Sequence, residues 1–321
     1  MRHEMNRSAT LTLLVIAVFA VLATVAFMTI GARGNWSFVL PFRATKLFAL
    51  VLVAYSIAVS TVLFQTITNN RILTPAIMGF DWLYMLLQTV FVFFLGAAAT
   101  SAIDPRLMFA IEVGTMLAFS LALYRFLFSG AARDIHLLLL IGVVFGTLFR
   151  SLSGFLQRLI DPNEFVVLQD RLFASFNGVD ANLLLISSLL VTAVSLIGLR
   201  IFNTFDVMSL GRETAISLGL DHRRITMIVL ALVTVLVTVS AALVGPVTFF
   251  GLLVANLAYI VMPTGKHRYV LPAAILIAIT CLVGGQTILE RVFAFDTALS
   301  IVIEFAGGLF FIFYLLRGHA R

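Results

Sequence analysis

Long apolar blocks separated by short polar stretches make up most of the chain. Most of these blocks reach the roughly 20 residues that an α-helix needs to cross the hydrocarbon core of a bilayer. This pattern predicts an all-α integral membrane protein, with an even number of spans and therefore both ends of the chain on the same side. The ten predicted spans cover residues 9–30, 44–66, 76–98, 107–128, 137–156, 181–201, 225–244, 247–262, 270–289 and 297–316.

The polar stretches between these blocks are too short to form a separate soluble domain. The two longest cover residues 157–180 and 202–224. Glycine, threonine and alanine in the second stretch favour two short helices joined by a turn, a shape suited to docking and not to crossing the bilayer. We therefore predict a single transmembrane domain over residues 1–321, which includes this inner segment at 202–224.

The composition excludes a water-soluble protein. Hydrophobic residues make up 61% of the chain and charged residues 11%, and the mean hydropathy is +1.11, so a polar surface cannot cover the fold. The net charge of +6 comes from scattered Lys and Arg residues that form no basic stripe, which argues against nucleic acid as a partner. Such scattered charges are typical of short loops on the cytoplasmic side of a membrane.

The positions of Lys and Arg also predict the orientation of the chain. With the N-terminus inside, the inner connections contain more basic residues than the outer ones. The N- and C-termini are therefore predicted to be cytoplasmic. The inner residues are Arg2, Arg7, Arg71, Arg125, Arg133, Arg200, Arg212, Arg223, Arg224, Lys266, Arg268, Arg317 and Arg321, and the outer ones are Arg33, Arg43, Lys46, Arg106, Arg150, Arg158, Arg171 and Arg291.

The sequence gives almost no support to an enzymatic function. No glycine-rich loop ends in Gly-Lys-Ser or Gly-Lys-Thr, so any ATP that drives this protein must be hydrolysed elsewhere. The five histidines lie in loops or at span ends, and the single cysteine, Cys281, lies in an apolar run. We predict no catalytic residue, no metal site and no cofactor.

The inner segment contains the motif that first indicates a function. Residues 210–219 read LGRETAISLG. They resemble the motif Glu-Ala-Ala, three residues, Gly, with which permeases of ATP-binding-cassette (ABC) importers dock onto their ATPase. Glu213, Thr214, Ala215 and Gly219 are in register with this motif, and Arg212 and Glu213 would supply polar contacts. An ordinary amphipathic turn on the cytoplasmic side is the alternative interpretation.

Further stretches, in one order along the chain, resemble the permeases of iron-siderophore and cobalamin importers. Residues 245–254 read GPVTFFGLLV, which is similar to the family's Gly-Pro-Ile-x-Phe-x-Gly-Leu-x-Val pattern almost residue for residue. The resemblance covers about residues 43–317 and implies the fold of a type II ABC importer permease. The other matching stretches are 58–65, 69–75 with Gly79, 265–272, Arg291 and 307–311.

Two stretches depart from the family's patterns. Residues 255–259 read ANLAY where the family has Pro-His-Leu-Ala-Arg, and residues 43–46 read RATK where it has Arg-x-Pro-Arg. Together with residues 61–71, these differences resemble the branch of siderophore permeases that work as one of two non-identical subunits, often for catecholate-type ferric complexes.

The resemblance implies roles for outer basic residues and for a translocation pathway. Arg43, Lys46 and Arg291 lie where the family's permeases meet acidic residues of a soluble binding protein, although cations near span ends also extend to the interface without any partner. Gly245 and Pro246 should break a helix, either as an element of the pathway or as a structural turn. The predicted pathway residues are Gln65, Gly245, Pro246, Gly251 and Asn256.

Three carboxylates lie within the predicted spans. Asp81 and Glu112 lie close to span ends, where we expect solvent to reach them. Glu304 lies deeper and is either a pathway carboxylate or a buried glutamate that is hydrogen-bonded between helices.

These features together predict a permease subunit that moves ferric siderophores across the bacterial inner (plasma) membrane. The implied partners are an ABC ATPase dimer, a second permease subunit that is a paralogue or a second copy of this chain, a periplasmic or lipoprotein siderophore-binding protein, and membrane lipid. Cobalamin or haem is the alternative cargo for the same machinery. A stand-alone secondary transporter or channel, which would need no ATPase, is the alternative from another class.

Overall fold

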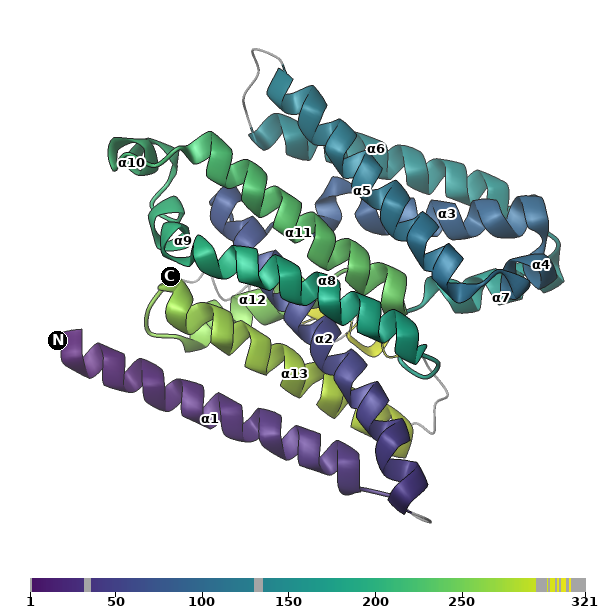
Figure 1. Ribbon diagram of the computed structural model, residues 1–321, viewed down its shortest axis with the longest axis horizontal. Coiled ribbons are helices and arrows are strands. Elements are labelled where there is room, and N and C mark those ends of the chain that lie inside the picture. Colours follow the sequence, from purple (N-terminus) through teal and green to yellow (C-terminus); the bar gives the residue numbers. More distant parts are fainter. Residues whose placement is uncertain are drawn as a thin grey trace.

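The fold is built from helices, as a computed structural model of the chain shows (Figure 1). The structure describes residues 2–31, 36–129 and 135–292, together with residues 299, 301–303, 305, 307–309 and 312. The helices are α1 (Arg2–Thr29), α2 (Trp36–Thr68), the 3-10 helix η1 (Pro75–Met78), α3 (Phe80–Leu95), α4 (Ala97–Ala102), α5 (Pro105–Ser129), α6 (Ile135–Gln157), α7 (Pro162–Leu172), α8 (Ala181–Arg200), α9 (Phe202–Met208), α10 (Arg212–Ser217), α11 (His222–Val244), α12 (Phe250–Val261) and α13 (His267–Arg291).

Seven of these helices are long and apolar enough to cross a membrane, which confirms the prediction of an all-α membrane protein. They are α1, α2, α5, α6, α8, α11 and α13, and each corresponds to one predicted span. Two more predicted spans contain the shorter apolar helices α3 and α12, of 16 and 12 residues. The tenth predicted span, 297–316, lies largely outside the described residues. Glu304 also lies outside them.

Two of the predicted spans, 76–98 and 247–262, are not continuous helices. In the first stretch, the chain forms η1, turns at Gly79, forms α3 and turns again at Gly96, and both glycines have positive φ (86° and 81°). In the second stretch, helix begins only at Phe250. Since a span needs roughly 20 residues, neither α3 nor α12 crosses the whole hydrocarbon core as one straight helix.

The helix α2 lies at the centre of the bundle and packs against α11 and α13. On one side, α1 lies along α13; on the other, α3, α5 and α6 pack together beside α11 (Figure 1). The central position of α2 fits its sequence, because α2 contains no charged residue after Lys46 and consists there mostly of apolar and small residues. Among the largest fully buried side chains are Phe64 of α2, Phe80 of α3 and Phe250 of α12.

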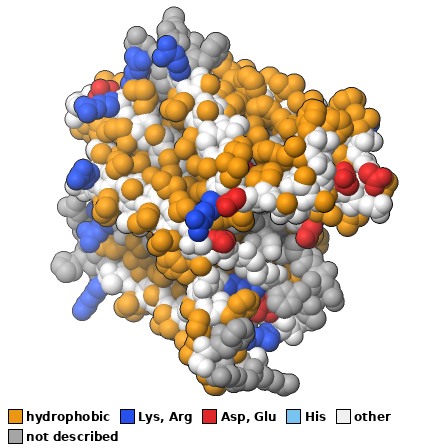
Figure 2. Space-filling model, turned by 45° about the vertical axis from the view of Figure 1, so that its right-hand side comes forward, with side chains coloured by type: hydrophobic (Ala, Val, Ile, Leu, Met, Phe, Trp, Pro, Cys, Tyr) orange, Lys and Arg blue, Asp and Glu red, His pale blue; other side chains and the backbone are white. Residues whose placement is uncertain are grey.

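The surface of the bundle is apolar, as a surface in contact with lipid requires. Figure 2 shows hydrophobic side chains over most of one face of the molecule. On α1, for example, Leu11, Leu14, Val18 and Leu22 are each more than half exposed. In water this arrangement would be unfavourable, since about 25 cal/mol is lost for each Å² of apolar surface left exposed.

The two ends of the bundle differ in their short helices. One end, called the α10 end below, contains α9, α10 and the beginning of α1; the opposite end, called the α7 end, contains α4 and α7 (Figure 1). At the α7 end, Asp180 caps α8, because Oδ1 accepts hydrogen bonds from the backbone N–H groups of Leu183 (3.1 Å) and Asn182 (2.7 Å). These backbone hydrogen bonds lower the pKa of the Asp180 carboxyl below its usual value.

Candidate functional site

The segment 202–224 forms two short helices, α9 and α10, at one end of the bundle (Figure 1). A turn joins them, and it ends at Gly211, which has a φ of 92°. A second glycine with positive φ, Gly219 (83°), follows α10 and lets the chain turn into α11. The two glycines therefore separate α10 from the short helix α9 on one side and from the long helix α11 on the other.

The residues of the predicted docking motif divide into one buried anchor and an exposed face. Ala215 is fully buried and holds α10 against its neighbours, α9 and α11. Arg212, Glu213, Thr214 and Gly219 are exposed. Beside them, Leu210, Ile216 and Leu218 are between 51% and 62% exposed. A protruding helix with apolar side chains and a pair of opposite charges has the chemistry of a protein-docking surface.

A break between α11 and α12 lies at Gly245 and Pro246, as the sequence predicts. The chain leaves α11 at Val244 and takes a φ of 96° at Gly245. The break packs against the connection that follows α7, since the backbone N–H of Ser175 donates to the carbonyl of Val244 at 2.8 Å. This hydrogen bond satisfies a backbone group that the break would otherwise leave without a partner inside the protein.

Three of the predicted pathway residues, Gly245, Pro246 and Gly251, surround one small cavity. Its volume is about 40 Å³, which is room enough for ordered water. The lining also includes polar side chains from three helices: Thr61 of α2, Asp81 of α3 and Ser240 of α11. The structure therefore brings these residues together beside the break.

Gln65 and Asn256, the other two predicted pathway residues, lie together at the α10 end. Nε2 of Gln65 and Nδ2 of Asn256 both donate to the backbone carbonyl of Arg71, at 2.7 and 3.2 Å. Both side chains therefore hold the connection that follows α2 in place. Gln65 and Arg71 also line a cavity of about 500 Å³ at this end, together with Tyr259 and Lys266.

Gly245→Ala should lower the amount of folded protein, because alanine is strained at a φ of 96° and its Cβ would lie 3.0 Å from the backbone Cα of Ala174. Gly284→Ala is the matched control, since a Cβ on this helical glycine meets nothing within 4 Å. We expect Gly245→Ala to reduce the protein recovered in the membrane fraction and its melting temperature, and Gly284→Ala to leave both near the wild type. Equal behaviour of the two variants would contradict the close packing at the break.

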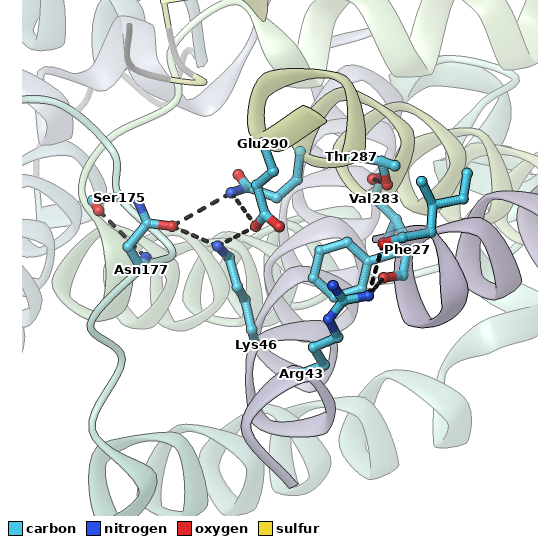
Figure 3. A network of polar contacts seen from close by, with 10 residues as sticks. Phe27, Arg43, Lys46, Ser175, Asn177, Val283, Thr287 and Glu290 are labelled. Atoms are coloured by element: carbon cyan, nitrogen blue, oxygen red, sulfur yellow. Dashed lines mark hydrogen bonds and ion pairs between the residues drawn. The ribbon is translucent and has the colours of Figure 1, made fainter. Parts of the chain in front are cut away.

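The three residues predicted to dock a binding protein all lie at the α7 end. Arg291 is exposed, whereas Arg43 and Lys46 are buried. Nη1 of Arg43 donates to the carbonyls of Phe27 (2.8 Å), Met28 (3.0 Å) and Ile30 (3.1 Å) and so caps the end of α1 (Figure 3). In the described conformation, Arg43 therefore serves an internal contact. Its contact with a partner stays a prediction.

Lys46 joins three distant parts of the chain at the α7 end. Its ammonium forms an ion pair with Glu290 of α13 and donates to Oδ1 of Asn177, in the connection before α8, at 2.5 Å (Figure 3). Gln286, one turn before Glu290, donates to Oε1 of Glu290 at 3.0 Å. The side chains of Lys46 and Glu290 are 7% and 12% exposed, so the pair is largely removed from water. It fixes α2, α13 and this connection to one another.

Two carboxylates that we expected to be solvated are buried instead. Glu112 of α5 is 3% exposed, and its Oε1 accepts a hydrogen bond of 2.5 Å from Nε2 of Gln88 in α3. Asp81 is 7% exposed at the start of α3. The expectation of solvation was wrong because α3 packs against α5, α6 and α11, so that Asp81 on α3 and Glu112 on α5 lie between helices and not in solvent. Across the part of the chain that the structure describes, no three His, Cys, Asp or Glu side chains gather in a way that could hold a metal ion.

Comparisons with known proteins agree with this architecture. Residues 8–317 match the FecCD transport family. The petrobactin import system permease protein YclO of Bacillus subtilis (strain 168) is 49% identical over 303 residues, which cover 93% of this chain and 96% of that protein. The petrobactin import system permease protein FatC of Bacillus anthracis is 37% identical over 278 residues, 87% of this chain and 78% of that protein.

A solved structure shares the fold. It is a metal-chelate type ABC transporter in an inward-facing conformation, with a TM-score of 0.81 and 20% identity over 96% of this chain and 99% of that one. The helices, the broken span at Gly245 and the family match over nearly the whole length lead to one conclusion: the chain belongs to the FecCD transport family.

Proposed function

We propose that this chain is a permease subunit of a bacterial ABC importer and that its cargo is ferric petrobactin or a closely related siderophore. The observation that carries the proposal is the 49% identity, over nearly the full length of both chains, to a petrobactin import permease. The exposed face of α10 supports the ABC part of the proposal, because it presents the residues of a docking motif to a partner.

In this proposal, an ABC ATPase dimer docks on Arg212, Glu213, Thr214 and Gly219, while Ala215 anchors α10 from behind. ATP is hydrolysed by that partner and not by this chain. A second permease subunit completes the membrane part, and the resemblance of residues 61–71 to permeases that work in non-identical pairs favours a paralogue over a second copy.

The α10 end faces the cytoplasm in the bacterial inner membrane, with the N- and C-termini on the same side. This orientation is supported by basic residues near that end, among them Arg212, Arg223, Arg224, Lys266 and Arg268, as loops on the inner side of a membrane usually show. The α7 end then faces outward, toward a periplasmic or lipoprotein siderophore-binding protein.

The outer docking site consists of Arg291, whose exposed charge can meet an acidic partner directly, and of Arg43 and Lys46 beneath it. Arg43 and Lys46 hold the ends of α1, α2 and α13 in place. The pathway runs past the break at Gly245, Pro246 and Gly251 toward Gln65 and Asn256. ATP binding and release at α10 would alternately open the two ends of this route. Iron is cargo in this cycle and not a cofactor.

Uptake by a strain that lacks this gene tests the proposed cargo. We expect the deletion to abolish import of radioactive iron supplied as ferric petrobactin, and the wild-type gene on a plasmid to restore it. Import of labelled cobalamin and of haem should not change. Loss of cobalamin or haem import, with petrobactin import intact, would contradict the proposed cargo while leaving the family membership in place.

A further inference from the structure

Three side chains connect α9 with α13 and α2 at the α10 end. Oδ1 of Asp206 accepts a hydrogen bond of 2.8 Å from the backbone N–H of His267 and lies 2.7 Å from Nδ1 of the same residue. On the other side of the ring, Nε2 lies 2.7 Å from Oγ1 of Thr66, in the last turn of α2. A single imidazole therefore bridges from α9 to the end of α2.

The imidazole is held in place and has little access to water. His267 is 2% exposed, and the ring of Phe205, also from α9, lies beside it with the ring centroids 5.8 Å apart. Each ring nitrogen has one partner, Asp206 or Thr66. A buried ring nitrogen that loses its partner is destabilising, so the ring favours the arrangement in which α9 and α2 keep their present separation.

The bridge holds in either protonation state of His267. The single proton of the Thr66 hydroxyl can go to the carbonyl of Val62, 2.8 Å away, or to Nε2 of His267. In the first case Nε2 carries a proton, and the ring is a cation beside the Asp206 carboxylate. In the second case the ring is neutral, with its proton on Nδ1. In both cases, Nδ1 donates to Asp206, so the contact is mechanical and needs no change of pH.

The bridge lies between the docking helix and the large cavity. Within the bundle, α10 packs against α9 and α11. Thr66, Asp206 and His267 all line the cavity of about 500 Å³ at the α10 end. Thr66 directly follows Gln65, which holds the carbonyl of Arg71 at the same cavity. A displacement of α9 and α10 would therefore pull on the wall of this cavity through one chain of hydrogen bonds.

We propose that Asp206, His267 and Thr66 are positioning residues that transmit movement of the α9–α10 segment to the ends of α2 and α13, and so open and close the cavity at the α10 end. This inference rests on the proposed function of α10 as the docking helix for an ATPase. The three residues line the cavity, and their role in this scheme is mechanical. They act through the helices they join, as packed elements with two discrete arrangements do.

The test is the amount of iron imported per ATP hydrolysed. The complete importer would be reconstituted in proteoliposomes with ferric petrobactin as the probe. Thr66→Val keeps the shape of the side chain and removes the hydroxyl, while Thr66→Ser keeps the hydroxyl. We expect Thr66→Val and Asp206→Ala each to lower iron imported per ATP by about twofold to thirtyfold, the range that mutations along a coupling route span. Thr66→Ser should stay near the wild type.

The double variant Asp206→Ala/Thr66→Val separates one shared link from two independent effects. Because both residues act through the same ring, we expect the double variant to be no worse than the more affected single variant. Asn203→Ala, an exposed position on α9, is the matched control and should leave the ratio unchanged.

Two results would overturn this inference without affecting the proposed function. One is a wild-type ratio of iron imported per ATP in both Thr66→Val and Asp206→Ala, and the other is losses that multiply in the double variant. If the wild-type complex itself imports no iron at the expense of ATP, the proposed function fails and the inference falls with it.

Discussion

Glu213→Arg should abolish ATP-driven import while the chain still folds and reaches the membrane. Glu213 is exposed on α10, next to Arg212, so its replacement disturbs no packing inside the bundle. A charge reversal at a docking surface places like charges opposite each other and costs several kcal/mol, which would reduce assembly with the ATPase by roughly a hundredfold or more. Co-purification of the ATPase with the tagged permease measures this loss directly, and uptake of ferric petrobactin measures its consequence.

Two further variants show whether the charge itself matters. Glu213→Gln keeps the size of the side chain and should retain part of the assembly. Asp170→Arg reverses another exposed carboxylate, on α7 at the opposite end of the bundle, and should leave assembly with the ATPase intact. Full assembly of the Glu213→Arg chain with its ATPase would show that α10 is not the docking helix.

Lys46→Met should destabilise the protein strongly, whereas Lys46→Met/Glu290→Met should be much closer to the wild type. The single replacement leaves the Glu290 carboxylate largely buried without its cationic partner. Removing one partner of a buried ion pair costs about 3–5 kcal/mol, while replacing both with apolar residues is often nearly neutral. Thermal unfolding of the purified permease would show this difference.

Lysine 266, the only other lysine of the chain, provides the matched control for this replacement. Lys266 is exposed, so Lys266→Met should change the melting temperature little. If Lys46→Met melts at the same temperature as Lys266→Met, the ion pair does not hold α2 and α13 together.

Most of the membrane architecture could be predicted from the sequence, because a helix that meets lipid must be apolar along a known length. The seven long helices follow from that requirement alone. The breaks at Gly79 and Gly96 could not be predicted in this way, because apolar residues continue on both sides of each turn and the length of the block still suits a span. Apolar runs report burial or lipid contact, and they do not report whether the helix within them is continuous.

The candidate functional residues were predictable to different degrees. The α10 motif and the break at Gly245 are local features, so a short stretch of sequence is enough to predict each of them. The partners of Lys46 and His267 are not local: Glu290 lies 244 residues after Lys46, and Asp206 lies 61 residues before His267. No pattern in a single sequence joins such positions. An unexplained polar residue within an apolar run, such as Glu112 or Lys46, was the available sign of a buried partner.

Import by reconstituted vesicles tests most directly the claim that this chain is driven by a separate ATPase docked on α10. Proteoliposomes would contain this chain and its second permease subunit, with or without the ATPase, and would receive the loaded binding protein and ATP. The account predicts that radioactive iron enters as ferric petrobactin only when ATPase and ATP are both present. Import at the same rate by vesicles that lack the ATPase would contradict it.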